Sequence, residues 1–135
     1  MAQSFPLKPK GFSPFLEQVG VTFTKIDNGY SQAVLEVNEN LLNSMAVLHG
    51  GATFTLVDCG MGAALYSCLE EGKKGRTLEA KIAYFKSATS GTVTCDTTVI
   101  HKSKTVATLE SDVRQDGALI AKAIGTFSIF EGERE

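Results

Sequence analysis

Six segments of the chain have the alternation or the β-branched composition of half-buried strands. They predict strands over residues 21–27, 30–37, 77–86, 91–102, 105–115 and 118–130. Asn28-Gly29 and Asp116-Gly117 separate consecutive strands, and both pairs favour tight hairpin turns because they tolerate positive φ. On the last strand the alternation places Leu119 and Ala121 on one face. The strands are therefore expected to pair antiparallel.

Residues 50–70 lack this alternation and predict one helix of about 21 residues. Its apolar groups spread around most of the circumference, which is typical of a helix buried on nearly all sides. A single helix of this kind is buried only if the sheet curls around it. A second, short helix is expected over residues 15–19, with Ser13 as N-cap and Gly20 at its end. The pattern predicts an α+β domain with a long central helix and a curved antiparallel sheet.

The composition narrows the class of protein. The 135 residues are 43% hydrophobic, which suits one folded domain and excludes a disordered chain. The net charge of −2 argues against general nucleic-acid binding. Residues 1–12 and 131–135 are expected to be flexible ends, and residues 1–12 lack the apolar run of a signal peptide.

Cysteine number and hydropathy bear on the compartment. Cys59, Cys68 and Cys95 are odd in number and lack CxxC spacing, which favours neither a disulfide framework nor a zinc site and fits a cytoplasmic protein. Residues 44–69 are apolar enough to test as a membrane span. Asp58 lies near the middle of that stretch, where a charge is costly, so no membrane association is expected.

Asp58 is the outlier of the predicted long helix. A carboxylate among apolar residues costs several kcal/mol unless it is paired or hydrogen-bonded. It is either a structural aspartate that bonds Thr55 or nearby backbone, or a catalytic acid or base. A cysteine nucleophile at Cys59 is a further alternative, although a cysteine in an apolar helix is usually inert.

The sequence Leu48-His49-Gly50-Gly51 lies where this helix is expected to begin. Glycines there expose backbone N–H groups at the positive end of the helix dipole, although they also simply allow a tight helix entry. Gly50 and Asp58 are eight residues apart, about 12 Å along a helix. One reacting carbonyl would not easily reach both in the same chain. We therefore expect a composite site at a two-fold interface, where the helices run antiparallel.

Basic residues gather near two predicted turns, Lys73, Lys74 and Arg76 in one and Lys102 and Lys104 in the other. Such lysines are usually solvated surface groups. If both turns border one cleft, they would suit a polyphosphate such as that of coenzyme A.

The segment Asn43-Ser-Met-Ala-Val-Leu-His49-Gly50-Gly51-Ala-Thr-Phe54-Thr-Leu-Val-Asp58 resembles the signature of the PaaI-like hotdog-fold acyl-CoA thioesterases. This branch includes the mammalian thioesterase superfamily member 2 type. The pattern is an Asn, an HGG six residues on, and an Asp nine residues after the His, and all three spacings hold. The element order agrees with the family from about residue 15 to residue 130.

The resemblance implies roles for individual residues. Asp58 would be the general base or nucleophile, and the Gly50 N–H would polarise the thioester carbonyl. His49 would support that loop and contact the thioester, Asn43 would orient water or thioester, and Thr77 would lie near the water. The resemblance also places Lys104 and Thr105 in a basic turn that meets the CoA nucleotide. The full set of residues expected to bind the substrate is Gly51, Phe54, Met61, Tyr84, Arg76, Lys102, Lys104 and Thr105.

The family also implies hydrolysis of an acyl-CoA with no cofactor or metal, coenzyme A being part of the substrate, in a homotetramer built as a dimer of dimers. Ser87 replaces a common family proline, and Gly60 and Gly62 are additional glycines that would widen the acyl pocket. Two alternatives stay open. One is a hotdog dehydratase on acyl-CoA or acyl-carrier-protein, using His49 with Asp58, and the other is a non-enzymatic acyl-CoA-binding protein.

Overall fold

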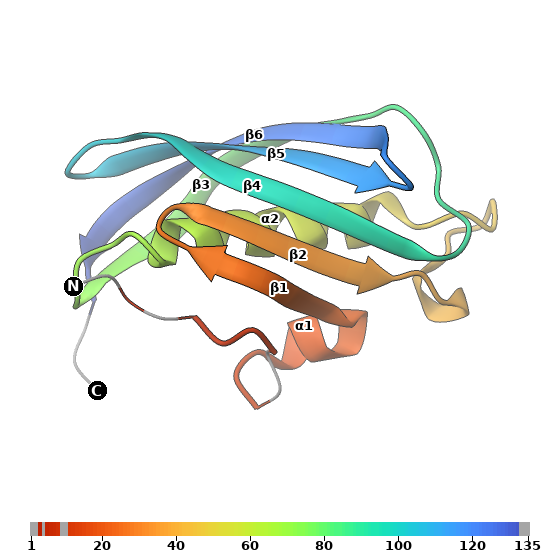
Figure 1. Ribbon diagram of the computed structural model, residues 1–135, viewed down its shortest axis with the longest axis horizontal. Coiled ribbons are helices and arrows are strands. Elements are labelled where there is room, and N and C mark those ends of the chain that lie inside the picture. Colours follow the sequence, from red (N-terminus) through yellow and green to blue (C-terminus); the bar gives the residue numbers. More distant parts are fainter. Residues whose placement is uncertain (1–2, 4, 9–10, 133–135) are drawn as a thin grey trace.

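The computed structural model describes residues 3, 5–8 and 11–132. In chain order, the elements are α1 (Pro14–Val19), β1 (Val21–Asp27), β2 (Tyr30–Glu36), the 3-10 helix η1 (Glu39–Leu41), α2 (Gly50–Tyr66), β3 (Lys73–Tyr84), β4 (Thr92–Lys102), β5 (Val106–Gln115) and β6 (Ala118–Glu131). The strands form one antiparallel sheet in the order β1-β2-β4-β5-β6-β3. The sheet curves around α2 (Figure 1). The predicted long helix wrapped by a curved antiparallel sheet is confirmed.

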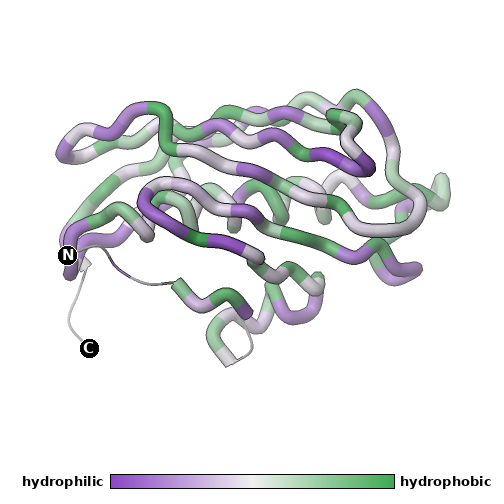
Figure 2. Tube along the Cα trace, in the orientation of Figure 1, coloured by the Kyte–Doolittle hydropathy of each residue, from purple (hydrophilic) through white to green (hydrophobic). Residues whose placement is uncertain are grey.

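The core lies between α2 and the concave face of the sheet. Leu56, Val57 and Met61 are fully buried on the helix, and alternate residues over much of β4, β5 and β6 are buried as well. This alternation is visible along the strands as apolar and polar segments (Figure 2). The energy that fixes the position of α2 is therefore the burial of its apolar surface against the sheet.

A row of small polar side chains crosses the concave face beneath the middle of α2. Ser31, Thr97 and Ser111 are neighbours on β2, β4 and β5, and all three are fully buried. Thr97 and Ser111 share a hydrogen bond of 2.7 Å, and Ser31 Oγ donates to the Gly60 carbonyl at 2.6 Å. Each hydroxyl has a hydrogen-bond partner, so the small side chains let the helix lie close to the sheet and leave none of these buried hydroxyls unpaired.

The predicted turns are confirmed. Asn28 and Gly29 have φ of 41° and 87°, and Asp116 and Gly117 have φ of 50° and 82°. Gly20 ends α1 with φ of 90°, in the left-handed region that glycine adopts at helix C-termini.

Two boundaries differ from the sequence prediction. The helix α2 ends at Tyr66 instead of residue 70, because the Ser67 hydroxyl donates to the Ala64 carbonyl and accepts from the Gly29 N–H. Strand β3 begins at Lys73 instead of residue 77, because it pairs with β6 as far as Glu131.

One face prediction on β6 is wrong. Ile120 is buried while Leu119 is only partly covered, although the alternation favoured Leu119. The register against β5 shifts between Val113 and Arg114, so that one extra residue of β6 is accommodated there. The bulge reverses which side chain points inward.

The N-terminal segment contacts the domain where it is described. Phe5 packs edge-to-face against Phe12, Phe23 and Tyr66, and the Leu7 carbonyl accepts from the Phe23 N–H. Phe5 and Leu7, within the end that the sequence predicts to be flexible, thus contact the domain, whereas residues 1–2, 4, 9–10 and 133–135 lie outside the described residues. Within the described part of the chain, no helix has the length and apolar character needed to cross a membrane.

Candidate active site

His49 caps the N-terminus of α2 with its side chain. The residue is extended, with φ of −61° and ψ of 135°, and its Nδ1 accepts from the Gly51 N–H at 2.7 Å. Accepting at Nδ1 places the proton of the neutral ring on Nε2. The imidazole is exposed, so this Nε2–H faces away from the cap. His49 therefore caps the helix at its entry.

The Gly50 N–H is the free donor of this helix end. The His49 carbonyl accepts from the N–H groups of Ala52 and Thr53, and the Gly51 N–H is taken by His49. None of the hydrogen bonds among the described residues uses the Gly50 N–H. The first N–H groups of a helix have no intrahelical partner and lie at its positive end. This N–H can therefore stabilise negative charge on an oxygen.

Tyr84, near the end of β3, covers Gly50 from the side. Its hydroxyl donates to the Gly50 carbonyl at 2.9 Å. A Cβ at Gly50 would lie 3.4 Å from the Tyr84 ring and hydroxyl, an ordinary van der Waals contact, so an alanine would fit here. Burial raises the pKa of Tyr84, so the phenol is a hydrogen-bond donor at neutral pH.

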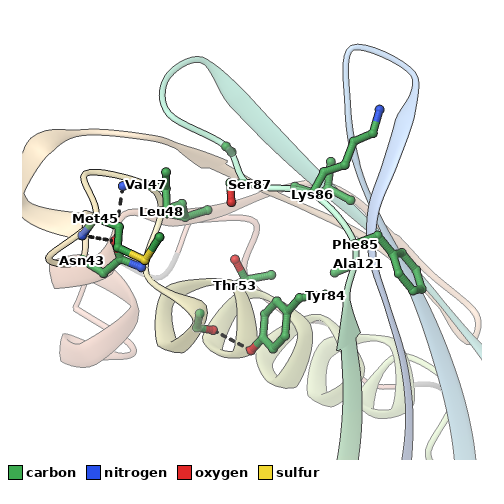
Figure 3. A pocket seen from close by; sticks show the side chains of 13 residues that line it. Asn43, Met45, Val47, Leu48, Thr53, Tyr84, Phe85, Lys86, Ser87 and Ala121 are labelled. Atoms are coloured by element: carbon green, nitrogen blue, oxygen red, sulfur yellow. Dashed lines mark hydrogen bonds between the residues drawn. The ribbon is translucent and has the colours of Figure 1, made fainter.

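A pocket of about 350 Å³ opens beside this helix end (Figure 3). It is lined by Asn43, Met45, Val47, Leu48, Gly50, Thr53, Tyr84, Phe85, Lys86, Ser87, Ala88, Ile120 and Ala121. Most of these side chains are apolar, and the main polar groups come from Asn43, Thr53, Tyr84, Lys86 and Ser87. Such a lining suits a ligand with an apolar body and a polar reacting group.

Asn43 organises the loop that forms one wall of the pocket. Its Oδ1 accepts from the N–H groups of Met45 and Val47 at 2.9 and 3.3 Å. The same loop holds Ala46 at φ of 60°, a left-handed conformation that is uncommon for alanine. The Oδ1 of Asn43 is thus engaged in the loop, and its amide nitrogen is the group left to meet a ligand.

Asp58 lies further along α2, away from this pocket. It is half-buried, and its Oδ1 accepts from the Thr77 hydroxyl of β3 at 2.8 Å. The expected bond between Asp58 and Thr55 is not formed, because Thr55 donates to the Gly51 carbonyl instead. Asp58 and Thr77 therefore form a second group of predicted site residues, separate from the pocket at Gly50.

Three of the predicted basic residues border one further pocket. This pocket of about 330 Å³ is lined by Leu69, Glu70, Lys73, Lys102, Ser103, Lys104 and Ile129. The Lys102 ammonium also donates to the Cys68 carbonyl at 2.9 Å, and Lys73 pairs with Glu131 at 2.7 Å. Arg76 lies elsewhere, over the Phe130 ring. The two predicted turns thus do border one cleft.

The remaining predicted binding residues are spread over the domain. Met61 is fully buried in the core and lines neither pocket, Phe54 is half-buried on α2, and Gly51 is exposed beside His49. The Thr105 carbonyl accepts from the Ile129 N–H. These residues contribute to helix packing and strand pairing in the single chain.

Sequence reasoning missed several residues of the pocket. Met45, Phe85 and Ile120 line it, and Thr53 presents its side chain to it from α2 (Figure 3). Thr53 follows Gly50 by three residues, a spacing that places both on one side of a helix and could have identified it. Phe85 and Ile120 come together only through the pairing of β3 with β6, which no local pattern shows.

The chain is similar in sequence to proteins of a known family. A sequence model of the thioesterase superfamily matches residues 45–121, more than half of the chain. Acyl-coenzyme A thioesterase 13 of Mus musculus is 30% identical over 118 residues, covering 85% of this chain and 82% of the mouse protein.

Solved structures are also similar. A conserved protein of Pseudomonas aeruginosa is 34% identical, with a TM-score of 0.87 over 93% of this chain and all of that chain. A thioesterase from Haemophilus influenzae has a TM-score of 0.90 over 98% of this chain and 96% of its own, but its 22% identity bears on the fold alone. The match of residues 45–121 to the family model, the related sequences and the curved sheet around α2 confirm that the chain belongs to the thioesterase superfamily and has the hotdog fold.

Proposed function

We propose that the protein hydrolyses an acyl-CoA thioester to a free acid and coenzyme A, with no cofactor. The observation that carries the proposal is the free Gly50 N–H, which lies at the positive end of α2 on the border of an apolar pocket. A thioester carbonyl bound there would gain a hydrogen bond to the oxygen on which negative charge develops. Donors placed in this way supply a large part of the catalysis in acyl transfer.

Asp58 would supply the second half of the chemistry. As a general base it takes a proton from water, the water oxygen bonds to the acyl carbon, the C–S bond breaks and the thiolate of CoA receives the proton. As a nucleophile it bonds to the acyl carbon itself, CoA leaves, and water hydrolyses the resulting anhydride. In either route the Thr77 hydroxyl fixes one carboxylate oxygen and leaves the other for the reaction.

We further propose that each active site combines Gly50 of one chain with the carboxylate of a second copy. The pocket at Gly50 does not include Asp58, and eight residues of helix separate the two by about 12 Å. Strand β3, which carries Thr77, is an edge strand whose Leu78 is 58% exposed. A long edge with exposed apolar groups favours pairing with another strand. A two-fold axis there would place Asp58 of one chain beside the other chain's pocket, and a dimer of dimers would follow the family.

The pocket lining supports an aryl or aliphatic acyl group. Met45, Phe85 and Ile120 supply apolar surface, while the reacting carbonyl would lie toward Gly50. The second pocket, with Lys73, Lys102 and Lys104, would accept the phosphates of the nucleotide. Replacement of Lys104 by alanine should therefore raise KM for acyl-CoA and leave kcat nearly unchanged.

Thiol release from acetyl-, phenylacetyl- and palmitoyl-CoA tests the proposal, with Gly50→Pro compared to Gly50→Ala. Both substitutions add a carbon beside Tyr84, but only proline removes the N–H. Proline is tolerated at the first position of a helix, and the extended His49 suits a following proline. We expect kcat of Gly50→Pro to be about 10²–10³-fold below that of Gly50→Ala.

Asp58→Asn is the companion variant, with an expected loss of about 10²-fold or more. Turnover that survives Asp58→Asn would remove the carboxylate from the mechanism. Equal rates for Gly50→Pro and Gly50→Ala would show that the Gly50 N–H has no part in the mechanism. Formation of an enoyl product without thiol release would favour the dehydratase, and binding without turnover, unchanged in Asp58→Asn, would favour the acyl-CoA-binding protein.

The composite site is tested by mixing two inactive variants. Asp58→Asn and Gly50→Pro chains, after exchange of subunits, form mixed pairs in about half of all dimers. Each mixed pair has one site with both defects and one intact site, so about a quarter of wild-type activity should return. If both residues served a site within one chain, the mixture would stay inactive although subunit exchange is shown by mass spectrometry.

A further inference from the structure

The peptide unit between Gly50 and Gly51 is held by a side chain at each of its two polar ends. Its carbonyl accepts from the Tyr84 hydroxyl at 2.9 Å, and its N–H donates to Nδ1 of His49 at 2.7 Å. The two partners come from different elements, since His49 precedes α2 and Tyr84 lies at the end of β3. Figure 3 shows the Tyr84 hydroxyl directed at this helix end.

This peptide unit lies where the backbone is intrinsically least restricted. Glycine has more accessible φ and ψ than any other residue, and two glycines stand in succession here. Rotation about ψ of Gly50 would turn the Gly50–Gly51 peptide relative to the Gly50 N–H. With both ends of that peptide bonded, the rotation is opposed from both sides, and the free N–H keeps one direction.

The Tyr84 side chain lies where it can hold this peptide unit. It lines the pocket together with Gly50, and 51% of its surface remains exposed. The Gly50 carbonyl is the only hydrogen-bond partner of its hydroxyl among the described residues. Its ring and hydroxyl lie 3.4 Å from the position that a Cβ at Gly50 would take, so the tyrosine packs directly beside this residue.

We propose that Tyr84 is a positioning residue for the reaction: with His49 it clamps the Gly50–Gly51 peptide and so aims the Gly50 N–H at the thioester oxygen. The inference rests on the proposed function. Because the tyrosine acts on the backbone donor instead of on the substrate, its loss should reduce transition-state stabilisation and spare ground-state binding.

Tyr84→Phe tests this role, because it removes one oxygen atom and keeps the ring. We expect kcat to fall roughly three- to tenfold, the size of one neutral hydrogen bond, with KM unchanged within about twofold. Tyr66→Phe is the matched control. Tyr66 ends the same helix, packs on Phe5, and lines neither the pocket at Gly50 nor the pocket at Lys104. This variant should leave kcat and KM unchanged.

A second readout is independent of activity. In ¹⁵N-glycine-labelled protein, the exchange of the Gly51 amide with water should become faster in Tyr84→Phe, because the carbonyl of that peptide then loses its bond to β3 and keeps only its intrahelical partner. It should also become faster in His49→Ala, which removes the acceptor. His49→Asn should restore slow exchange, because asparagine is a favoured N-cap whose side-chain oxygen accepts from the first-turn N–H groups.

The two readouts separate the inference from the proposed function. Faster Gly51 exchange together with a lower kcat supports the clamp. Unchanged Gly51 exchange in Tyr84→Phe overturns it, whatever the activity. Faster exchange with an unchanged kcat overturns its role in the reaction. If the wild-type protein releases no thiol, the proposed function fails, and the amide exchange alone decides whether Tyr84 and His49 hold the peptide.

Discussion

Gly60 lies in the middle of α2, above the row of buried hydroxyl groups on the sheet. A Cβ at this position would lie 3.1 Å from the Thr97 hydroxyl oxygen, 3.6 Å from that of Ser31 and 3.7 Å from the Cys95 sulfur. The hydroxyls have little freedom to withdraw, because Ser31 bonds the Gly60 carbonyl and Thr97 bonds Ser111. Gly60→Ala therefore tests whether the close approach of helix and sheet is tightly specified.

Two opposing effects set the magnitude. Alanine is favoured over glycine in a helix interior by about 0.8–1.0 kcal/mol. An extra methyl group in a well-packed interior costs about 1–3 kcal/mol. We expect the free energy of unfolding of Gly60→Ala to fall by up to about 2 kcal/mol, since the shortest contact is to a bonded, buried oxygen. A gain near 1 kcal/mol would mean that the helix moves away from the sheet at no cost.

A double-mutant cycle isolates the contact. Thr97→Ala alone should cost about 1–3 kcal/mol, because it leaves the Ser111 hydroxyl without its partner. In that background the oxygen facing the new methyl is gone, so Gly60→Ala should become neutral or stabilising. Urea unfolding followed by far-UV circular dichroism, at one protein concentration, measures all four proteins; the chain has no Trp. Additivity within about 0.5 kcal/mol would refute the contact as the cause.

Two further predictions concern ionisable groups of the sheet. Burial and, to a smaller extent, the bond to the Asp96 carboxylate raise the pKa of Tyr30 to about 12, so its neutral form stabilises the fold fully below pH 10. That contribution is lost between pH 10 and 12, and Tyr30→Phe should show a weaker fall of unfolding free energy across this range; identical pH profiles would contradict it. Burial raises the pKa of the Cys95 thiol to about 11, so Ellman's reagent at pH 8 should reach Cys95 only as fast as the protein unfolds, and immediate reaction of a third thiol in native protein would contradict this.

The fold was predictable from sequence where local patterns carry the information. Alternation located the strands, and Asn28-Gly29 marked a hairpin through its backbone preference. The end of α2 was not predictable, because residues 67–69 are apolar enough to continue a helix. The helix stops where Ser67 exchanges hydrogen bonds with Ala64 and Gly29, and Gly29 lies 38 residues away in sequence.

The candidate site was also predictable only where it depends on residues close together in sequence. The helix entry at His49 and Gly50 is a local structure, and its capping follows from neighbouring residues. The partner of Asp58 is not local: Thr55 is three residues away, yet Thr77 on β3 makes the bond. Met61 was expected to bind the substrate but is fully buried in the core, because the direction of a helical side chain depends on the packing of the whole helix.

The glycines of α2 connect these observations. Gly60 leaves room for Thr97, and a Cβ at Gly51 would lie 2.9 Å from Nδ1 of His49, whereas a Cβ at Gly50 would be in ordinary contact with Tyr84. Each glycine weakens the isolated helix by about 1 kcal/mol relative to alanine, so the helix owes its position to tertiary packing. The Gly50 donor is carried by α2 and the tyrosine that holds it by β3. A shift of the helix against the sheet would therefore separate the two, which makes the geometry of the site depend on the packing at Gly60, ten residues along the same helix.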